Sequence, residues 1–130
     1  MIREKKKFPK YLALIRLCPC LICGNIPCEA AHIRFSSAKY GKVNSGVGSK
    51  PHDKFTVPLC AYHHRLGPKA QHSMGESQFW ELHAVEPLEL ALALWGERDN
   101  LPQMQRIAYG TYQFTLDSRK NRGTSPAYRK

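Results

Sequence analysis

The sequence predicts a small α+β domain built around a strand–loop–strand–helix unit and closed by a zinc site. Two pairs of potential metal ligands, Cys20/Cys23 and Cys60/His63, each have two residues between them, which is a spacing typical of tetrahedral zinc sites. Two short runs with strand character lie between the pairs, and apolar residues at helical spacing flank them. A chain of 130 residues suits one domain with a modest core that a metal would help to stabilise.

The N-terminal part predicts a helix that follows a basic arm, Met1–Lys7. Pro9 suits the first position of a helix, and apolar residues follow at helical spacing as far as Leu17. The Cys18-Pro19-Cys20 segment would end this helix. Cys20–Gly24 is then expected to form a metal-binding turn, because Gly24 gives the backbone the freedom to bring sulfur and amide groups together.

The central part predicts two strands joined by a long loop. Cys28–Ile33 would form a short strand that ends near His32, and Phe55–Leu59 would form the second strand, with Pro58 at an edge or at its end. Ser36–Lys50 is rich in Ser, Gly and Lys and should be a long exposed loop, of the kind that often carries function. Cys60–Leu66 would turn into a short helix, which Gly67-Pro68 would stop.

The C-terminal part predicts helices and then a tail. From Gly75 onward large apolar residues recur at helical spacing, and Pro87 restarts the pattern before Gly96 ends it; these residues are the expected core. After Asn100 the pattern weakens, and Ser118–Lys130 is basic and poor in apolar residues, which predicts a disordered tail. The expected division is a basic arm and helix at 1–17, the metal-binding domain with a helical extension at 18–99, and a C-terminal extension at 100–130.

Charge predicts a polyanionic partner, with nucleic acid first. The net charge is +10, and seven basic residues but only one acid lie between His32 and Lys69. Six of the ten acids lie between Glu76 and Asp99, so the positive field is concentrated around the Cys/His segment and at the two ends. No apolar run is long enough for a membrane span, and Cys pairs at this spacing favour metal over disulfides in a reducing compartment, so we expect a cytoplasmic protein.

The expected structural zinc site consists of Cys20, Cys23, Cys60 and His63. Four such ligands close the coordination sphere, so the site would hold metal without performing chemistry. Cys18 competes poorly with Cys20, because only a proline separates the two. Cys28 has no partner at a suitable spacing and is expected to be a buried free thiol.

The remaining histidines suggest chemistry in addition to structure. A strand that ends in His32, a loop, a second strand and a metal-bound turn leading into a helix with His64 form a ββα-metal arrangement in outline. In such a site a neutral imidazole takes a proton from water, and a divalent ion stabilises the phosphate oxyanion and the leaving oxygen. His52 is expected to lie on the surface of the loop.

Four segments in this order resemble the HNH endonucleases, and most closely the phage-associated branch of Ref-like recombination nucleases. They are Glu29-Ala-Ala-His32-Ile, Gly48-Ser-Lys50-Pro-His-Asp53, Val57-Pro-Leu-Cys60-Ala-Tyr-His63-His64 and Gln71-His72-Ser-Met-Gly-Glu76. The resemblance covers about Cys20 to Trp80 and not the ends of the chain.

The resemblance implies a role for each matching residue. His32 would be the general base, and Asp53 would orient it or hold metal; His64 and His72 would bind the catalytic ion, which is Mg²⁺, Mn²⁺ or Zn²⁺. The sequence departs from the family in two places. Ala31 stands where many relatives have a ligand, so that Asp53 or Glu29 must supply one. His64 and His72 are also eight residues apart, with Gly67 and Pro68 between them, so His72 must reach back from a loop or from a new helix start.

The function expected from these features is metal-dependent DNA cleavage with little sequence specificity and without a small-molecule cofactor. The resemblance suggests phage replication or recombination as its setting. The residues expected to contact phosphates are Arg34, Lys50, Lys54 and Arg65. A non-catalytic zinc-knuckle DNA-binding module is the alternative, because it needs only the four zinc ligands and the charge. A zinc-dependent nucleotide deaminase is disfavoured, since the chain has no His-x-Glu segment.

Overall fold

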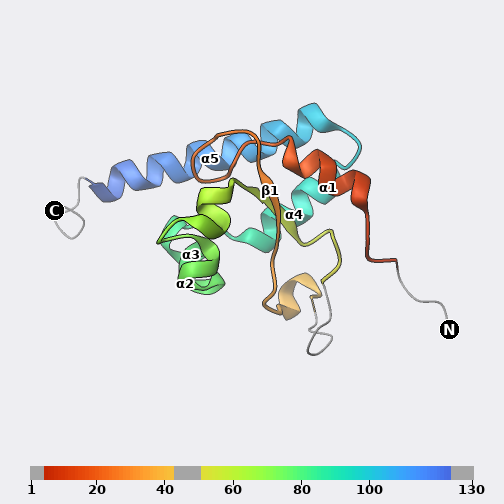
Figure 1. The fold of residues 1–130 in the computed structure, drawn as a ribbon, viewed down its shortest axis with the longest axis horizontal. Helices are drawn as coiled ribbons and strands as arrows, with labels where there is room; N and C mark the ends of the chain where they lie inside the picture. Colours follow the sequence, from red (N-terminus) through yellow and green to blue (C-terminus); the bar gives the residue numbers. More distant parts are fainter. Residues whose placement is uncertain (1–4, 43–50, 124–130) are drawn as a thin grey trace.

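The computed structural model describes residues 5–42 and 51–123, which form the predicted α+β arrangement (Figure 1). Its elements, in chain order, are α1 (Pro9–Arg16), β1 (Glu29–His32), the 3₁₀ turn η1 (Ala38–Tyr40), β2 (Thr56–Leu59), the π-helical turn η2 (Tyr62–Leu66), α2 (Gln71–Met74), α3 (Glu76–His83), α4 (Pro87–Gly96) and α5 (Leu101–Gly123). In these residues no helix is both long and apolar enough to cross a membrane.

The sheet has two antiparallel strands in the described residues, with Glu29 opposite Leu59 and His32 opposite Thr56. All four residues of β2 are buried, because α1 and α4 both pack against this strand. Pro58 lies in a strand that has a single partner, as its missing N–H group requires. The sheet therefore supports His32 and Glu29 at the two ends of β1.

The core forms where the apolar pattern predicts it. Phe79, Leu88 and Leu94 are fully buried, and Ile15 of α1 joins them. Pro9 begins α1 as expected, and Gly96 is the last residue of α4. The structure describes only part of the loop between the strands. Residues 36–42 contain η1, whereas residues 43–50, which include the predicted phosphate contact Lys50, lie outside the described residues.

His52 is not on the surface, which corrects the prediction. Its side chain is 9% exposed, and its ring stacks on Phe8 at 5.2 Å and meets the edge of Trp95 at 5.4 Å. Trp95 also contacts Tyr11. This aromatic cluster joins the segment before α1 to the segment before β2 and buries the imidazole.

One long helix covers most of the C-terminal extension and continues into the segment predicted to be a disordered tail. Helix α5 runs from Leu101 to Gly123, so the first residues of the predicted tail are helical, and residues 124–130 lie outside the described part. Thr115 donates to the carbonyl of Leu21 at 3.1 Å, and Arg119 donates to the carbonyl of Ile22 at 2.8 Å. These contacts with the Cys20–Cys23 turn stabilise a helix whose own sequence is only weakly amphipathic.

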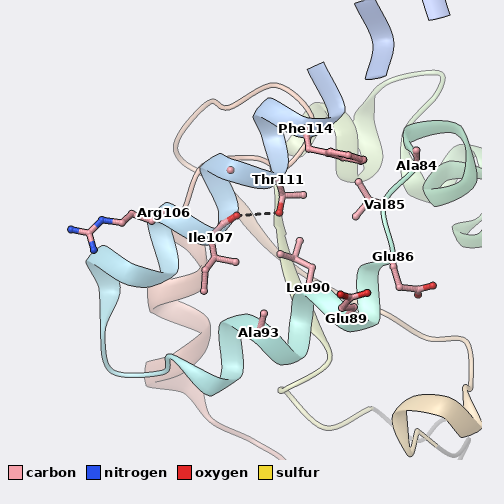
Figure 2. Close-up of a pocket in the computed structure, with 11 residues that line it drawn as sticks. Ala84, Val85, Glu86, Glu89, Leu90, Ala93, Arg106, Ile107, Thr111 and Phe114 are labelled. Carbon is pink, nitrogen blue, oxygen red and sulfur yellow. Dashed lines mark hydrogen bonds between the residues drawn. The ribbon is translucent and has the colours of Figure 1, made fainter. Parts of the chain in front are cut away.

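An open groove of about 400 Å³ lies between α4 and α5 (Figure 2). Leu90 and Ile107 lie in it, Phe114 is at one end, and Glu86, Glu89 and Arg106 bring charges to it. The groove is on a different part of the fold from the candidate site residues.

Candidate metal centre and histidine clusters

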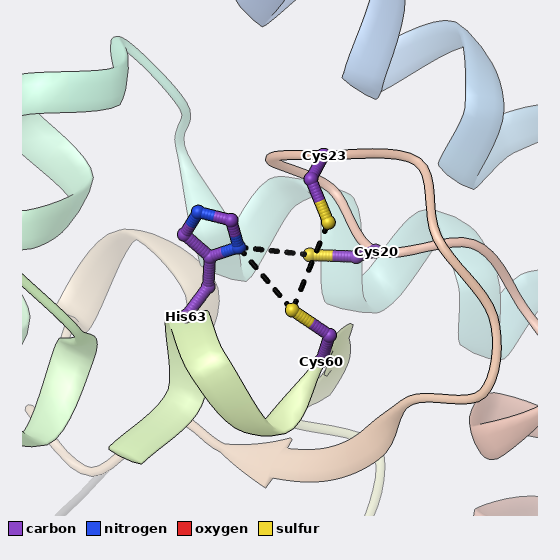
Figure 3. A group of neighbouring side chains, drawn as sticks. All are labelled: Cys20, Cys23, Cys60 and His63. Atoms are coloured by element: carbon purple, nitrogen blue, oxygen red, sulfur yellow. Dashed lines mark hydrogen bonds between the residues drawn. The ribbon is translucent and has the colours of Figure 1, made fainter. Parts of the chain in front are cut away.

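The four predicted zinc ligands form one cluster in the structure (Figure 3). The ligand atoms of Cys20, Cys23, Cys60 and His63 all lie within 4.8 Å of one another. The Cys23 and Cys60 sulfurs are 3.7 Å apart, and Nδ1 of His63 is 3.3 Å from the Cys60 sulfur. Zinc–sulfur bonds of about 2.3 Å place two sulfurs of a tetrahedral site about 3.8 Å apart. Three thiols and one imidazole at these separations therefore fit a metal such as zinc.

The first turn of this centre is organised by its own backbone. Gly24 adopts a left-handed conformation with φ 75°, and its N–H group donates to the carbonyl of Cys20 at 2.8 Å. A side-chain hydrogen bond with Cys28, together with the contact with His63, lowers the pKa of Cys20 to about 3 despite its burial. Burial instead raises the pKa of Cys23 to about 12. A metal that binds both sulfurs must therefore displace a proton from Cys23.

Cys18 and Cys28 lie outside the cluster, as the sequence predicts. Both are buried and free. The Cys18 thiol donates to the carbonyl of Leu14 at 3.5 Å, and the Cys28 thiol donates to the carbonyl of Asn25 at 3.4 Å.

His32 and Asp53 form a hydrogen-bonded pair. Nε2 of His32 is 2.8 Å from Oδ1 of Asp53, whose side chain is 8% exposed. The second carboxylate oxygen accepts the N–H group of Phe8 at 2.6 Å, and the N–H group of Asp53 donates to the carbonyl of Lys6 at 2.9 Å. The end of the basic arm is therefore bound beside this pair. The sequence could not predict these two contacts, because every residue except proline has a backbone N–H group and its presence does not depend on residue type.

His64 and His72 come together in a second cluster, with Glu29. Nδ1 of His64 is 2.7 Å from Oε1 of Glu29, and the two imidazole rings are 4.5 Å apart between centroids. A new helix, α2, begins at Gln71 and returns His72 to His64 across the Gly67-Pro68 turn. Arg65 adds two hydrogen bonds to Glu29 through Nε and one through Nη2.

The predicted grouping of Asp53 with His64 and His72 does not form. Asp53 contacts His32 and the arm, whereas Glu29 contacts His64. In the described residues the Cys₃His group is the one place where three or more potential ligand atoms converge. The reason is the sheet: Asp53 is held beside His32 at the C-terminal end of β1, whereas Glu29 and its partner His64 lie at the N-terminal end of the strand.

Glu76 fixes the backbone just after β1. It belongs to a segment that carries the resemblance, but the sequence alone predicts no role for it. Its carboxylate accepts the N–H groups of Arg34 and Phe35 and the amide of Gln71. The Arg34 side chain is exposed, and burial, the charge of His64 and the charge of Arg34 together lower the pKa of His72. The neutral form of His72, which can bind a metal, is thereby favoured.

The other residues predicted to contact phosphates differ in exposure and in their partners. Lys54 is partly buried and lies over the Phe55 ring at 5.3 Å. Arg65 is paired with Glu29. Lys42, one of the basic residues counted toward the positive field, is buried and donates to the carbonyl of Arg34 at 3.0 Å, so it is not part of the basic surface.

A family model described as "Protein of unknown function (DUF968)" matches residues 2–84. The chain belongs to the DUF968 family. The DUF968 span includes the Cys₃His centre, both strands and both histidine clusters, and it ends just after α3. No curated protein and no solved structure matches the chain.

Replacing Glu29 by Gln should remove a pH-dependent contribution to stability. The hydrogen bonds from Arg65 lower the pKa of Glu29 from 4.5 to about 2. A lowered pKa means that the folded form binds this proton less readily, so the contribution is complete above pH 4.5 and is lost as the pH falls toward 2. Arg65 is exposed and solvent screens the pair, so the effect on stability should be small.

Thermal melts of the wild type and Glu29→Gln across this pH range test the prediction. The difference in Tm should shrink as the pH falls, and Arg65→Gln should give the same pattern. The comparison is restricted to pH values at which both proteins still hold their zinc, because loss of the ion would unfold both. A difference that does not depend on pH would contradict the assignment.

Proposed function

We propose that the chain is a metal-dependent DNA endonuclease of the HNH type. The observation that carries this proposal is the Glu29–His64–His72 cluster, which lies directly beside a separate Cys₃His centre. A purely structural zinc module has no need of a second cluster in which an acid is hydrogen-bonded to one imidazole and a second imidazole packs against the first.

The hydrogen bond to Glu29 sets the protonation of His64. A carboxylate accepts only, so Nδ1 of His64 carries the proton and Nε2 keeps its lone pair. Histidines that bind metals usually donate their other ring N–H group to a carboxylate in this way. In the proposed site His64 and His72 hold the ion and Glu29 orients His64. A divalent ion bound there supplies charge stabilisation at the scissile phosphate.

Asp53 orients His32 as Glu29 orients His64, which suits His32 to act as the general base. Asp53 accepts a hydrogen bond from the Nε2–H group of His32. Nδ1 is therefore the nitrogen that can take a proton from water. The Phe8 N–H group and the aromatic cluster hold Asp53 in place. In this proposal Asp53 positions the base and is not a metal ligand.

The charge distribution supports DNA as the substrate. The chain carries a net charge of +10, Arg34 is exposed near His72, and Lys6 is bound next to Asp53. These groups suit phosphate contacts, which would make binding largely independent of sequence.

A plasmid-nicking assay with added Mg²⁺, Mn²⁺ or Zn²⁺ tests the proposal. We expect relaxation of supercoiled DNA that depends on the added ion, and binding that weakens by about one log unit per log unit of salt for each phosphate contacted. DNA binding without nicking under any of these ions would contradict the proposal and favour the zinc-knuckle binding module.

A further inference from the structure

The turn that carries the metal-binding histidines also presents an exposed apolar surface. Tyr62 is 57% exposed and Leu66 is 66% exposed. They are four residues apart in η2, which is closed by the hydrogen bond from the Gly67 N–H group to the carbonyl of Tyr62 at 2.8 Å. Single exposed apolar residues are common, but here two lie close together beside the proposed catalytic cluster.

The Tyr62 ring is supported from within the protein. A Cβ atom on Gly67 would come within 2.9 Å of the ring atoms Cε2 and Cζ, so the ring packs directly against this glycine. The edge of the ring meets the His63 imidazole at 5.2 Å and an interplanar angle of 88°. Because His63 belongs to the Cys₃His centre, the metal site fixes the aromatic ring while more than half of its side chain stays accessible.

Exposed basic residues lie close to this aromatic residue in the chain and near the histidine cluster. Lys69 is exposed just beyond Leu66, and Arg34 is exposed near His72. Arg65 follows His64 in η2 and is exposed, but its guanidinium is paired with Glu29. A supported aromatic ring among basic groups is typical of surfaces that bind single-stranded nucleic acid, where the ring stacks on a base and the cations contact the backbone. A continuous duplex keeps its bases stacked on one another and cannot offer a free base face.

We propose that Tyr62 is a stacking platform for an unpaired base, so that the preferred substrate is single-stranded or locally unpaired DNA. The substrate preference rests on the proposed function, because only a nuclease has a DNA substrate. The stacking contact itself is independent of catalysis, and the experiment measures it without cleavage.

The test compares binding of a labelled single-stranded oligonucleotide and of the corresponding duplex by fluorescence anisotropy, with zinc-loaded protein and no further divalent ion. Tyr62→Ala should weaken single-strand binding by roughly 5- to 150-fold and leave duplex binding nearly unchanged. Tyr62→Phe keeps an aromatic face and should bind like the wild type, whereas Tyr62→Leu should behave like Tyr62→Ala.

Phe114→Ala provides the matched control, because Phe114 is 58% exposed but lies on α5, in the groove of Figure 2. It should not change single-strand binding. Zinc content and the melting temperature verify that each variant is folded. Equal affinity of wild type and Tyr62→Ala for the single strand would overturn the proposal, as would equal losses for single strand and duplex. Selective loss at Tyr62 would uphold the stacking site even if the nicking assay showed no cleavage, so the two proposals fail separately.

Discussion

Replacing Cys23 by Ala should unfold the protein rather than merely weaken its metal binding. The four ligands come from two separate segments, the turn after α1 and the junction between β2 and η2. Leu21 and Ile22, which lie between Cys20 and Cys23, are almost completely buried. Structural zinc typically supplies about 10–16 kcal/mol of binding free energy, which is comparable with the whole stability of a domain, about 5–15 kcal/mol.

Metal analysis and circular dichroism measure this effect. The wild type should hold one zinc ion per chain and lose its helical signal with a strong chelator, and Cys23→Ala should lack both the metal and the cooperative melt. Cys18→Ala is the control, because Cys18 is also buried but lies outside the centre. It should keep its zinc and lose only about 1 kcal/mol. A Cys23→Ala protein with normal zinc content and melting temperature would refute the assignment.

The sequence predicted the metal centre because its spacing is a local property. Two residues between Cys20 and Cys23, and between Cys60 and His63, fix each pair on one turn, and a single ion then requires the two turns to meet. The same holds for α1, since Pro9 both permits and marks its first position.

Long-range contacts account for what the sequence did not predict. Helix α5 depends on hydrogen bonds from Thr115 and Arg119 to carbonyls about a hundred residues earlier in the chain (separations of 94 and 97), and no local pattern indicates them. His52 is buried because Phe8 and Trp95 enclose it from two distant segments. Such contacts override a weak or polar local pattern.

The positions of α2 and β1 determine which side chains lie beside His64. The separation of eight positions between His64 and His72 allows α2 to start at Gln71 and bring the rings together. Glu29 rather than Asp53 lies beside His64 because Glu29 is at the start of β1, whereas Asp53 is held by His32 at the end of that strand. The sequence named both candidates, but only the register of β1 with β2 places Glu29 next to η2.

Replacing His32 by Ala should reduce DNA cleavage by roughly two to four orders of magnitude, the usual contribution of a general base. Zinc content and DNA binding should remain near those of the wild type, because His32 contacts Asp53 and no ligand of the Cys₃His centre. Since Asp53 is buried, His32→Ala leaves its Oδ1 atom without the hydrogen bond from His32, while Oδ2 keeps the one from Phe8. His32→Gln is therefore the second variant: its amide can still donate to Asp53 but cannot take a proton from water.

His64→Ala should also abolish cleavage, but through loss of the catalytic ion, so that a high concentration of Mn²⁺ should restore part of its activity and none of the activity of His32→Gln. The double variant then tests whether the two clusters act on one phosphate. If they serve the same chemical step, adding His32→Gln to His64→Ala should reduce the rate little further, because residues that act as a unit are not additive. Near-normal cleavage by His32→Gln under saturating metal would instead make His32 a packing residue, held by Asp53 for the stability of the segment before α1, and would leave the Glu29–His64–His72 cluster to act without it.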